Sequence, residues 1–149
     1  MRVGVIGAGT MGHGIAQVAA MKGCTVVLAD ASPDQLTAAL TAIRANLDKG
    51  VEKGKVSAAL RDSTLANLST GDVRAASEGA DFVIEAVPER LELKQRLLCE
   101  VAAIAPPSSV SCATSASTTA KSDALESQAD GAAVRQVTVC LAKRAMGES

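Results

Sequence analysis

Three glycines near the N-terminus have the spacing of a phosphate-binding turn. They are Gly7, Gly9 and Gly12 in the stretch GAGTMG, which follows the apolar residues 2–6 and opens a helical pattern that ends at Gly23. In a strand-turn-helix unit the first glycine permits a tight turn, the second lets a pyrophosphate approach the backbone, and the third permits close helix packing. Amides at the start of the helix can then face the anion.

An acidic residue after the second apolar run strengthens the prediction of a nucleotide site, for which the glycines alone are weak evidence. Residues 25–29 (TVVLA) form a second apolar run, and Asp30 follows it, eighteen residues after Gly12. A carboxylate at this place can accept hydrogen bonds from the ribose hydroxyls of an adenosine, and it would repel a 2'-phosphate. The next three residues include no arginine that could receive such a phosphate. The combination predicts dinucleotide binding, with NAD preferred to NADP, and a purely structural turn is the alternative.

Strands and helices alternate along the chain. Apolar runs at 2–6, 25–29, 81–87 and 109–113 predict four buried strands, and residues 68–72 predict a short extended piece. Helices are expected from Met11 to Gly23 and over 33–49, 57–65, 90–105 and 134–146. This alternation predicts a Rossmann-type, doubly wound α/β fold with a mostly parallel sheet that lacks its last strands. We expect the four main strands, numbered along the chain, in the order 3-2-1-4, with 109–113 as an exposed edge.

The length of the chain predicts one domain over residues 1–149. A formal net charge of -1 and a single aromatic residue, Phe82, argue against nucleic acid as a partner. The four cysteines are too widely spaced for a zinc or Cys-x-x-Cys site, so we expect no metal, buried free thiols and a reducing compartment. Neither a signal peptide nor a membrane span is apparent, so a cytoplasmic protein without a membrane partner is expected.

Several stretches resemble the NAD-binding domain of the 3-hydroxyacyl-CoA dehydrogenases, especially the bacterial 3-hydroxybutyryl-CoA dehydrogenases. They are VGVIGAGTMGHGIAQVAA, VVLAD, VEKGK, ADFVIEAVPERLELKQRLL and APP. The resemblance covers residues 1–113, and residues 114–149 form a degenerate tail that ends in the expected helix. It implies NAD as cofactor and oxidation of an L-3-hydroxyacyl-CoA to the 3-oxoacyl-CoA.

The resemblance also implies roles for particular residues. The cofactor motif is matched by Gly7, Gly9, Met11, Gly12 and Asp30, and the positions near the nicotinamide half by Glu89 and Lys94. Lys53 matches a residue that contacts CoA, and Ser117 in ATSAST is the best match to the substrate-side serine. The alternative for Glu89 and Lys94 is a solvated helix turn, for Lys53 a solvated lysine, and for Ser117 a polar loop residue.

The catalytic part of the family pattern is not matched. Members use a histidine, oriented by a glutamate, to accept the hydroxyl proton, assisted by a serine and an asparagine. The one histidine here is His13, in the first turn after the glycine motif, and ATSAST has no asparagine. We expect that a segment with the catalytic pair and the C-terminal helical domain are missing, which favours homo-oligomers. A dehydrogenase acting on acyl-CoA, a non-catalytic NAD-binding module and a subunit completed by a partner all stay open.

Overall fold

The computed structural model describes residues 1–88, 90–106, 109–113 and 135–136. The strands are β1 (Arg2–Ile6), β2 (Thr25–Ala29), β3 (Leu68–Gly71), β4 (Phe82–Glu85), β5 (Val110–Ala113) and β6 (Arg135–Gln136). The helices are α1 (Thr10–Met21), α2 (Pro33–Glu52), α3 (Ala58–Ala66), α4 (Val73–Ser77) and α5 (Leu91–Ile104). Every strand and helix expected within residues 1–113 is therefore present, and α4 is an additional short helix.

The strands form one sheet in the order β3-β2-β1-β4-β5-β6, and its five pairings are all parallel. The predicted Rossmann-type α/β fold is confirmed. The predicted place of 81–87 beside residues 25–29 is wrong, because the short β3 pairs with β2 there, while β4 pairs with β1 through Val3 and Phe82. The chain thus winds outward from β1 to β3 and crosses back to β4 before it continues to β5. When all crossovers are right-handed, such a reversal places the connecting helices of the two halves on opposite faces of the sheet.

The second edge of the sheet also differs from the prediction. Val110 and Ser111 of β5 pair with Arg135 and Gln136 of β6, so β5 is not an open edge at these two residues. The helix expected over 134–146 is wrong at residues 135–136, which are strand, and its remaining residues lie outside the described part of the chain. The predicted tail, residues 114–149, is otherwise undescribed.

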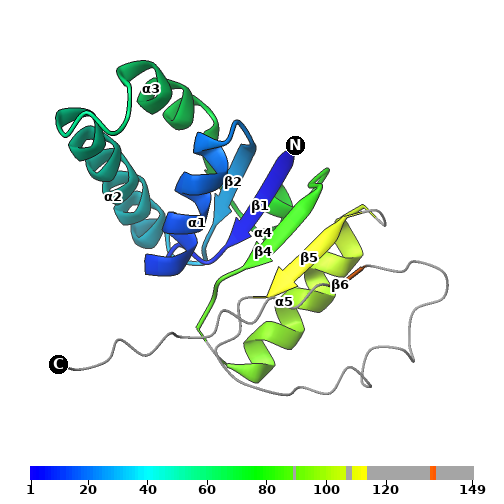
Figure 1. The fold of residues 1–149 in the computed structure, drawn as a ribbon. Helices are drawn as coiled ribbons and strands as arrows, with labels where there is room; N and C mark the ends of the chain where they lie inside the picture. Colours follow the sequence, from blue (N-terminus) through cyan, green and yellow to red (C-terminus); the bar gives the residue numbers. More distant parts are fainter. Residues whose placement is uncertain (89, 107–108, 114–134, 137–149) are drawn as a thin grey trace, which may run out of the picture.

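Two apolar cores cover the two faces of the sheet, because successive side chains of a strand point to opposite faces. Val5 and Leu28 pack with α1 and α2 on one face, where Ile43 of α2 is fully buried. Ile6 and Val27 pack on the other face with residues of α4 and α5. Figure 1 shows the resulting layers, with α1, α2 and α3 on one side of the sheet and α5 on the other.

The core face of α1 is made of small residues. Gly12, Ala16 and Ala20 are its buried positions, whereas the larger Val18 is 59% exposed. Small residues let the helix approach the sheet closely, while the larger Ile15 and Met21 are only partly buried against this core. The free thiol of Cys24 is buried as expected, whereas the expectation of a buried thiol is wrong for Cys99, which is exposed.

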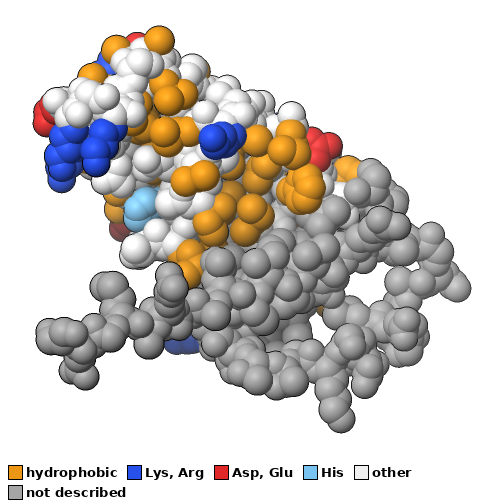
Figure 2. All heavy atoms as spheres, in the orientation of Figure 1, with side chains coloured by type: hydrophobic (Ala, Val, Ile, Leu, Met, Phe, Trp, Pro, Cys, Tyr) orange, Lys and Arg blue, Asp and Glu red, His pale blue; other side chains and the backbone are white. Residues whose placement is uncertain are grey.

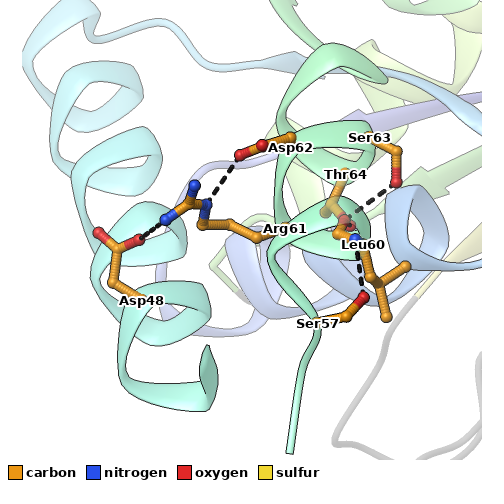
Figure 3. A network of polar contacts seen from close by, with 7 residues as sticks. All are labelled: Asp48, Ser57, Leu60, Arg61, Asp62, Ser63 and Thr64. Carbon is orange, nitrogen blue, oxygen red and sulfur yellow. Dashed lines mark hydrogen bonds and ion pairs between the residues drawn. The ribbon is translucent and has the colours of Figure 1, made fainter. Parts of the chain in front are cut away.

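Serine caps and one ion-pair network order the α2 and α3 region. Ser32 Oγ accepts a hydrogen bond from Gln35 N at 3.4 Å, and Ser57 Oγ accepts one from Leu60 N at 3.1 Å. Arg61 of α3 reaches Asp48 of α2 and its neighbour Asp62 (Figure 3). The hydrogen bond and charge of Asp62, then the charge of Asp48, raise the pKa of Arg61 above its ordinary value. This network joins the two helices at the surface.

Candidate cofactor site

The carboxyl ends of β1 and β4 lie side by side where the winding of the sheet reverses. From β1 the chain continues to β2 on one side, and β4 lies on the other side. Ala86 N donates a hydrogen bond to Ile6 O at 2.7 Å, which holds the loops after these two strands together. In open α/β sheets ligands bind in the crevice at such a switch point, so this edge is the place to look for a site.

Gly7 and Gly12 build the turn after β1. Gly7 has φ +105°, a conformation that favours glycine, and a Cβ there would lie 2.6 Å from Ala86 O. A Cβ on Gly12 would collide with the carbonyl oxygen of Gly7. The predicted tight turn at Gly7 and close packing at Gly12 are confirmed, because neither position has room for a side chain.

Gly9 differs from these two glycines because the space beside it is open. It is the N-cap of α1, its side has no heavy atom within 4 Å of a Cβ position, and no side chain caps the helix. Gly9 and the following Thr10 are exposed, and the first turn of α1 carries no acidic residue. A pyrophosphate fits such a place, since it can approach the backbone amides without meeting a side chain or a negative charge.

Asp30 is fixed by two backbone amides at the end of β2. Its Oδ2 accepts a hydrogen bond from Ala8 N at 2.8 Å, and its Oδ1 accepts one from Ser32 N at 2.9 Å. The carboxylate is half-buried and lies beside the glycine turn, on the β2 side of the switch point. The residue expected to hold the adenosine ribose therefore also joins β2 to the turn.

A buried ion pair lies on the opposite side of the switch point. Glu85, the last residue of β4, has its Oε2 3.6 Å from Lys94 Nζ of α5, and the two side chains are only 4% and 12% exposed. Glu85 Oε1 also accepts a hydrogen bond from Val87 N at 2.9 Å. For Lys94 the alternative of a solvated helix turn is wrong. Glu85 was not predicted, and its one signal in the sequence is an acid within the apolar run DFVIEAV.

Met11 lies in the first turn of α1, after the N-cap Gly9. Its exposed side chain lines an apolar groove of about 810 Å³, together with Val18 of α1 and Phe82 and Ile84 of β4. Figure 2 shows hydrophobic side chains gathered on this face. The described residues that line the groove include no carboxylate and neither Gly7 nor Gly9, so we place the cofactor at the crevice and not here. A role for Met11 in cofactor binding stays a prediction.

The remaining predicted residues lie away from the crevice or outside the described chain. Lys53 is the C-cap of the 20-residue α2, so about 30 Å of helix separates it from the Asp30 end. His13 has its Nδ1 2.9 Å from Gly9 O and faces the start of α1. Glu89 and Ser117 lie outside the described residues. The residues that the structure describes include no group of three His, Cys, Asp or Glu side chains that could hold a metal ion.

The parallel sheet, the glycine turn and Asp30 together define a dinucleotide-binding α/β domain. Residues 2–135 match the family described as 3-hydroxyacyl-CoA dehydrogenase, NAD binding domain. The chain belongs to this family, and the expected cofactor, NAD, is confirmed at the level of the family.

Individual relatives agree with this assignment. The chain is 46% identical over 106 residues to 3-hydroxyadipyl-CoA dehydrogenase of Escherichia coli K12, covering 70% of this chain and 22% of that protein. It is 37% identical over 109 residues to 3-hydroxybutyryl-CoA dehydrogenase of Bradyrhizobium diazoefficiens, covering 73% and 37%. The crystal structure of (S)-3-hydroxybutyryl-CoA dehydrogenase from Ralstonia eutropha matches with a TM-score of 0.74 and 32% identity, covering 78% and 41%. The chain thus covers less than half the length of each.

None of the helices in the described ranges is long and apolar enough to cross a membrane.

Proposed function

We propose that this chain is the NAD-binding part of an L-3-hydroxyacyl-CoA dehydrogenase, with the cofactor in the crevice between the ends of β1 and β4. The pyrophosphate lies against Gly9 and the amides at the start of α1, and Asp30 accepts hydrogen bonds from the adenosine ribose. The observation that carries this proposal is the Asp30 carboxylate, which two amides hold beside a glycine turn with an open side. Glycine, carboxylate and helix end have the arrangement that dinucleotides require.

The reaction transfers a hydride from the 3-carbon of the hydroxyacyl-CoA to NAD⁺, and the hydroxyl proton leaves to a base. The products are the 3-oxoacyl-CoA, NADH and a proton. When bound, NAD supplies the hydride acceptor, while the residues of this chain hold and orient it. His13 is the one histidine in the sequence, and its Nδ1 lies against Gly9 O on the pyrophosphate side. We do not assign it the proton, because that place is remote from the nicotinamide half.

A second candidate is an NAD-binding module without dehydrogenase activity. The sequence favours it in one respect, since no histidine other than His13 is present to accept the proton. The third candidate is a subunit to which a partner protein supplies this proton acceptor. Acyl-CoA as substrate, Lys53 as a contact of its CoA part and Ser117 on the substrate side belong to the first and third proposals. A single domain over residues 1–149, self-association and a cytoplasmic location are further proposals, the last supported by the free thiols of Cys24 and Cys99.

Calorimetric titration with NADH and NADPH tests the cofactor proposal directly. We expect saturable binding of NADH, much weaker binding of NADPH because of the Asp30 charge, and loss of NADH affinity in Asp30→Ala. Reduction of acetoacetyl-CoA by NADH, assayed in the same samples, separates the candidates. Turnover supports the dehydrogenase, binding without turnover supports the module or the subunit completed by a partner, and absence of NADH binding contradicts all three.

A further inference from the structure

The ion pair of Glu85 and Lys94 lies on the side of the crevice where the reactive half of the cofactor must be. Asp30 ends β2 and Glu85 ends β4, and these strands flank β1 on opposite sides. A dinucleotide crosses the switch point with one nucleotide on each side. With the adenosine ribose at Asp30, the nicotinamide half lies toward the carboxyl ends of β4 and β5, beside this pair.

The charge of the nicotinamide ring distinguishes the two redox states of the cofactor, because the ring is cationic in NAD⁺ and uncharged in NADH. A lone ammonium near the ring would weaken binding of NAD⁺ and leave NADH nearly unaffected. Both side chains of the pair are almost completely buried, so water screens their charges poorly. The opposite charges of Glu85 and Lys94 largely cancel at the ring, provided that both are present.

We propose that Glu85 is a specificity-determining residue that sets the relative affinity of the site for NAD⁺ and NADH by neutralising the charge of Lys94. This inference rests on the proposed binding of NAD in the crevice. The backbone fixes Glu85 for this role, because Glu85 Oε1 accepts a hydrogen bond from Val87 N while Oε2 faces Lys94. Lys94 is held from the other side, since it belongs to α5 and its amide donates to Arg90 O at 3.0 Å.

The test compares the dissociation constants of NAD⁺, NADH and ADP-ribose for the full chain and three variants at near-neutral pH. Glu85→Gln removes the negative charge and keeps an oxygen for Val87 N. Lys94→Met removes the positive charge, and the double variant removes both. ADP-ribose lacks the nicotinamide ring, so its affinity reports whether the crevice is intact, independently of the ring charge.

We expect Glu85→Gln to weaken NAD⁺ relative to NADH by roughly tenfold, because removal of one negative charge leaves a more positive surrounding for the cationic ring in a site that water screens poorly. The double variant returns the ratio to near the wild-type value, with ADP-ribose affinity unchanged throughout. A wild-type ratio in Glu85→Gln, or a double variant that fails to restore it, overturns the inference while NAD binding stands. Equal weakening of all three ligands also overturns it, because that indicates a structural role. If none of the three binds the wild-type chain, the proposed function itself fails.

Discussion

Asp30 Oδ2 accepts a hydrogen bond from Ala8 N at 2.8 Å, so the end of β2 and the glycine turn after β1 are joined through one carboxylate. The same carboxylate accepts a second hydrogen bond from Ser32 N, at the start of α2. Three segments that meet at the crevice are thereby held in one arrangement before any cofactor binds. Preorganisation of this kind lowers the ordering cost of binding.

Replacement of Asp30 by alanine should therefore affect both binding and stability. We expect NADH affinity to fall by roughly tenfold to a hundredfold, and the free energy of unfolding to fall by about 1–3 kcal/mol, because two amides lose their acceptor. Calorimetry and urea denaturation measure the two effects. Asp34→Ala is the matched control, since Asp34 is an exposed acid in the first turn of α2. Equal NADH affinity in the two variants would show that Asp30 does not contact the cofactor.

Two glycines of α1 should respond oppositely to alanine. Gly12→Ala places a methyl group against the carbonyl of Gly7, and overpacking of this kind costs about 1–3 kcal/mol of stability. Gly14 has no heavy atom within 4 Å of its Cβ position, so Gly14→Ala should stabilise the helix by about 0.5–1 kcal/mol. Thermal or urea unfolding of the purified variants gives the comparison. Destabilisation of similar size in both would contradict the close contact of Gly7 and Gly12.

A core substitution should change stability without changing the site. Ile43 of α2 is fully buried in the core that α2 forms with α1 and the sheet. Ile43→Ala should lower the free energy of unfolding by about 2–5 kcal/mol through lost burial and the cavity left behind. NADH affinity of the folded fraction, measured at low temperature, should stay at the wild-type value. A selective loss of affinity in a variant that unfolds at the normal urea concentration would contradict this assignment.

Lys53 offers a test of the acyl-CoA proposal that leaves the crevice untouched. If the CoA part contacts Lys53, Lys53→Ala should weaken CoA binding by roughly threefold to tenfold, because one charge-assisted contact is lost. Lys55→Ala, two residues further along the same exposed loop, is the control and should have little effect. Titration with CoA and with NADH separates the ligands. Equal effects on CoA in both variants would indicate only general attraction by positive charge.

The sequence predicted those parts of the fold that have an uninterrupted apolar pattern. β1, β2, β4 and the turn with Gly7 and Gly12 were found because buried parallel strands and glycine turns have strong local signals. The order of strands was predicted incorrectly because the local sequence signal of β3 is weak. Its sequence, LSTG, has no fully buried residue, yet its backbone occupies the place beside β2. Pairing of backbones, rather than burial of side chains, decides the position of such a strand.

Within the site, local sequence patterns identified candidate residues but not the residues with which they interact. The proposed ribose role of Asp30 follows from its spacing after Gly12, whereas its hydrogen bond to Ala8 depends on how β1 and β2 pair. No local sequence pattern predicts the ion pair of Glu85 and Lys94. The two residues are nine positions apart, and the pair forms only because the end of a strand lies against a helix. Tertiary contacts of this kind require the fold.

The most direct measurement is an NADH titration by calorimetry of the wild-type chain, Gly9→Ala and Gly14→Ala. Gly9 has φ −67° and open space at its Cβ position, so alanine there should change the free energy of unfolding by less than about 1 kcal/mol. If the pyrophosphate lies against Gly9, its methyl group should lower NADH affinity at least about tenfold while the fold is preserved. Gly14→Ala should bind as the wild type does. Wild-type affinity in Gly9→Ala would contradict the central claim, because it would place the cofactor away from the glycine turn.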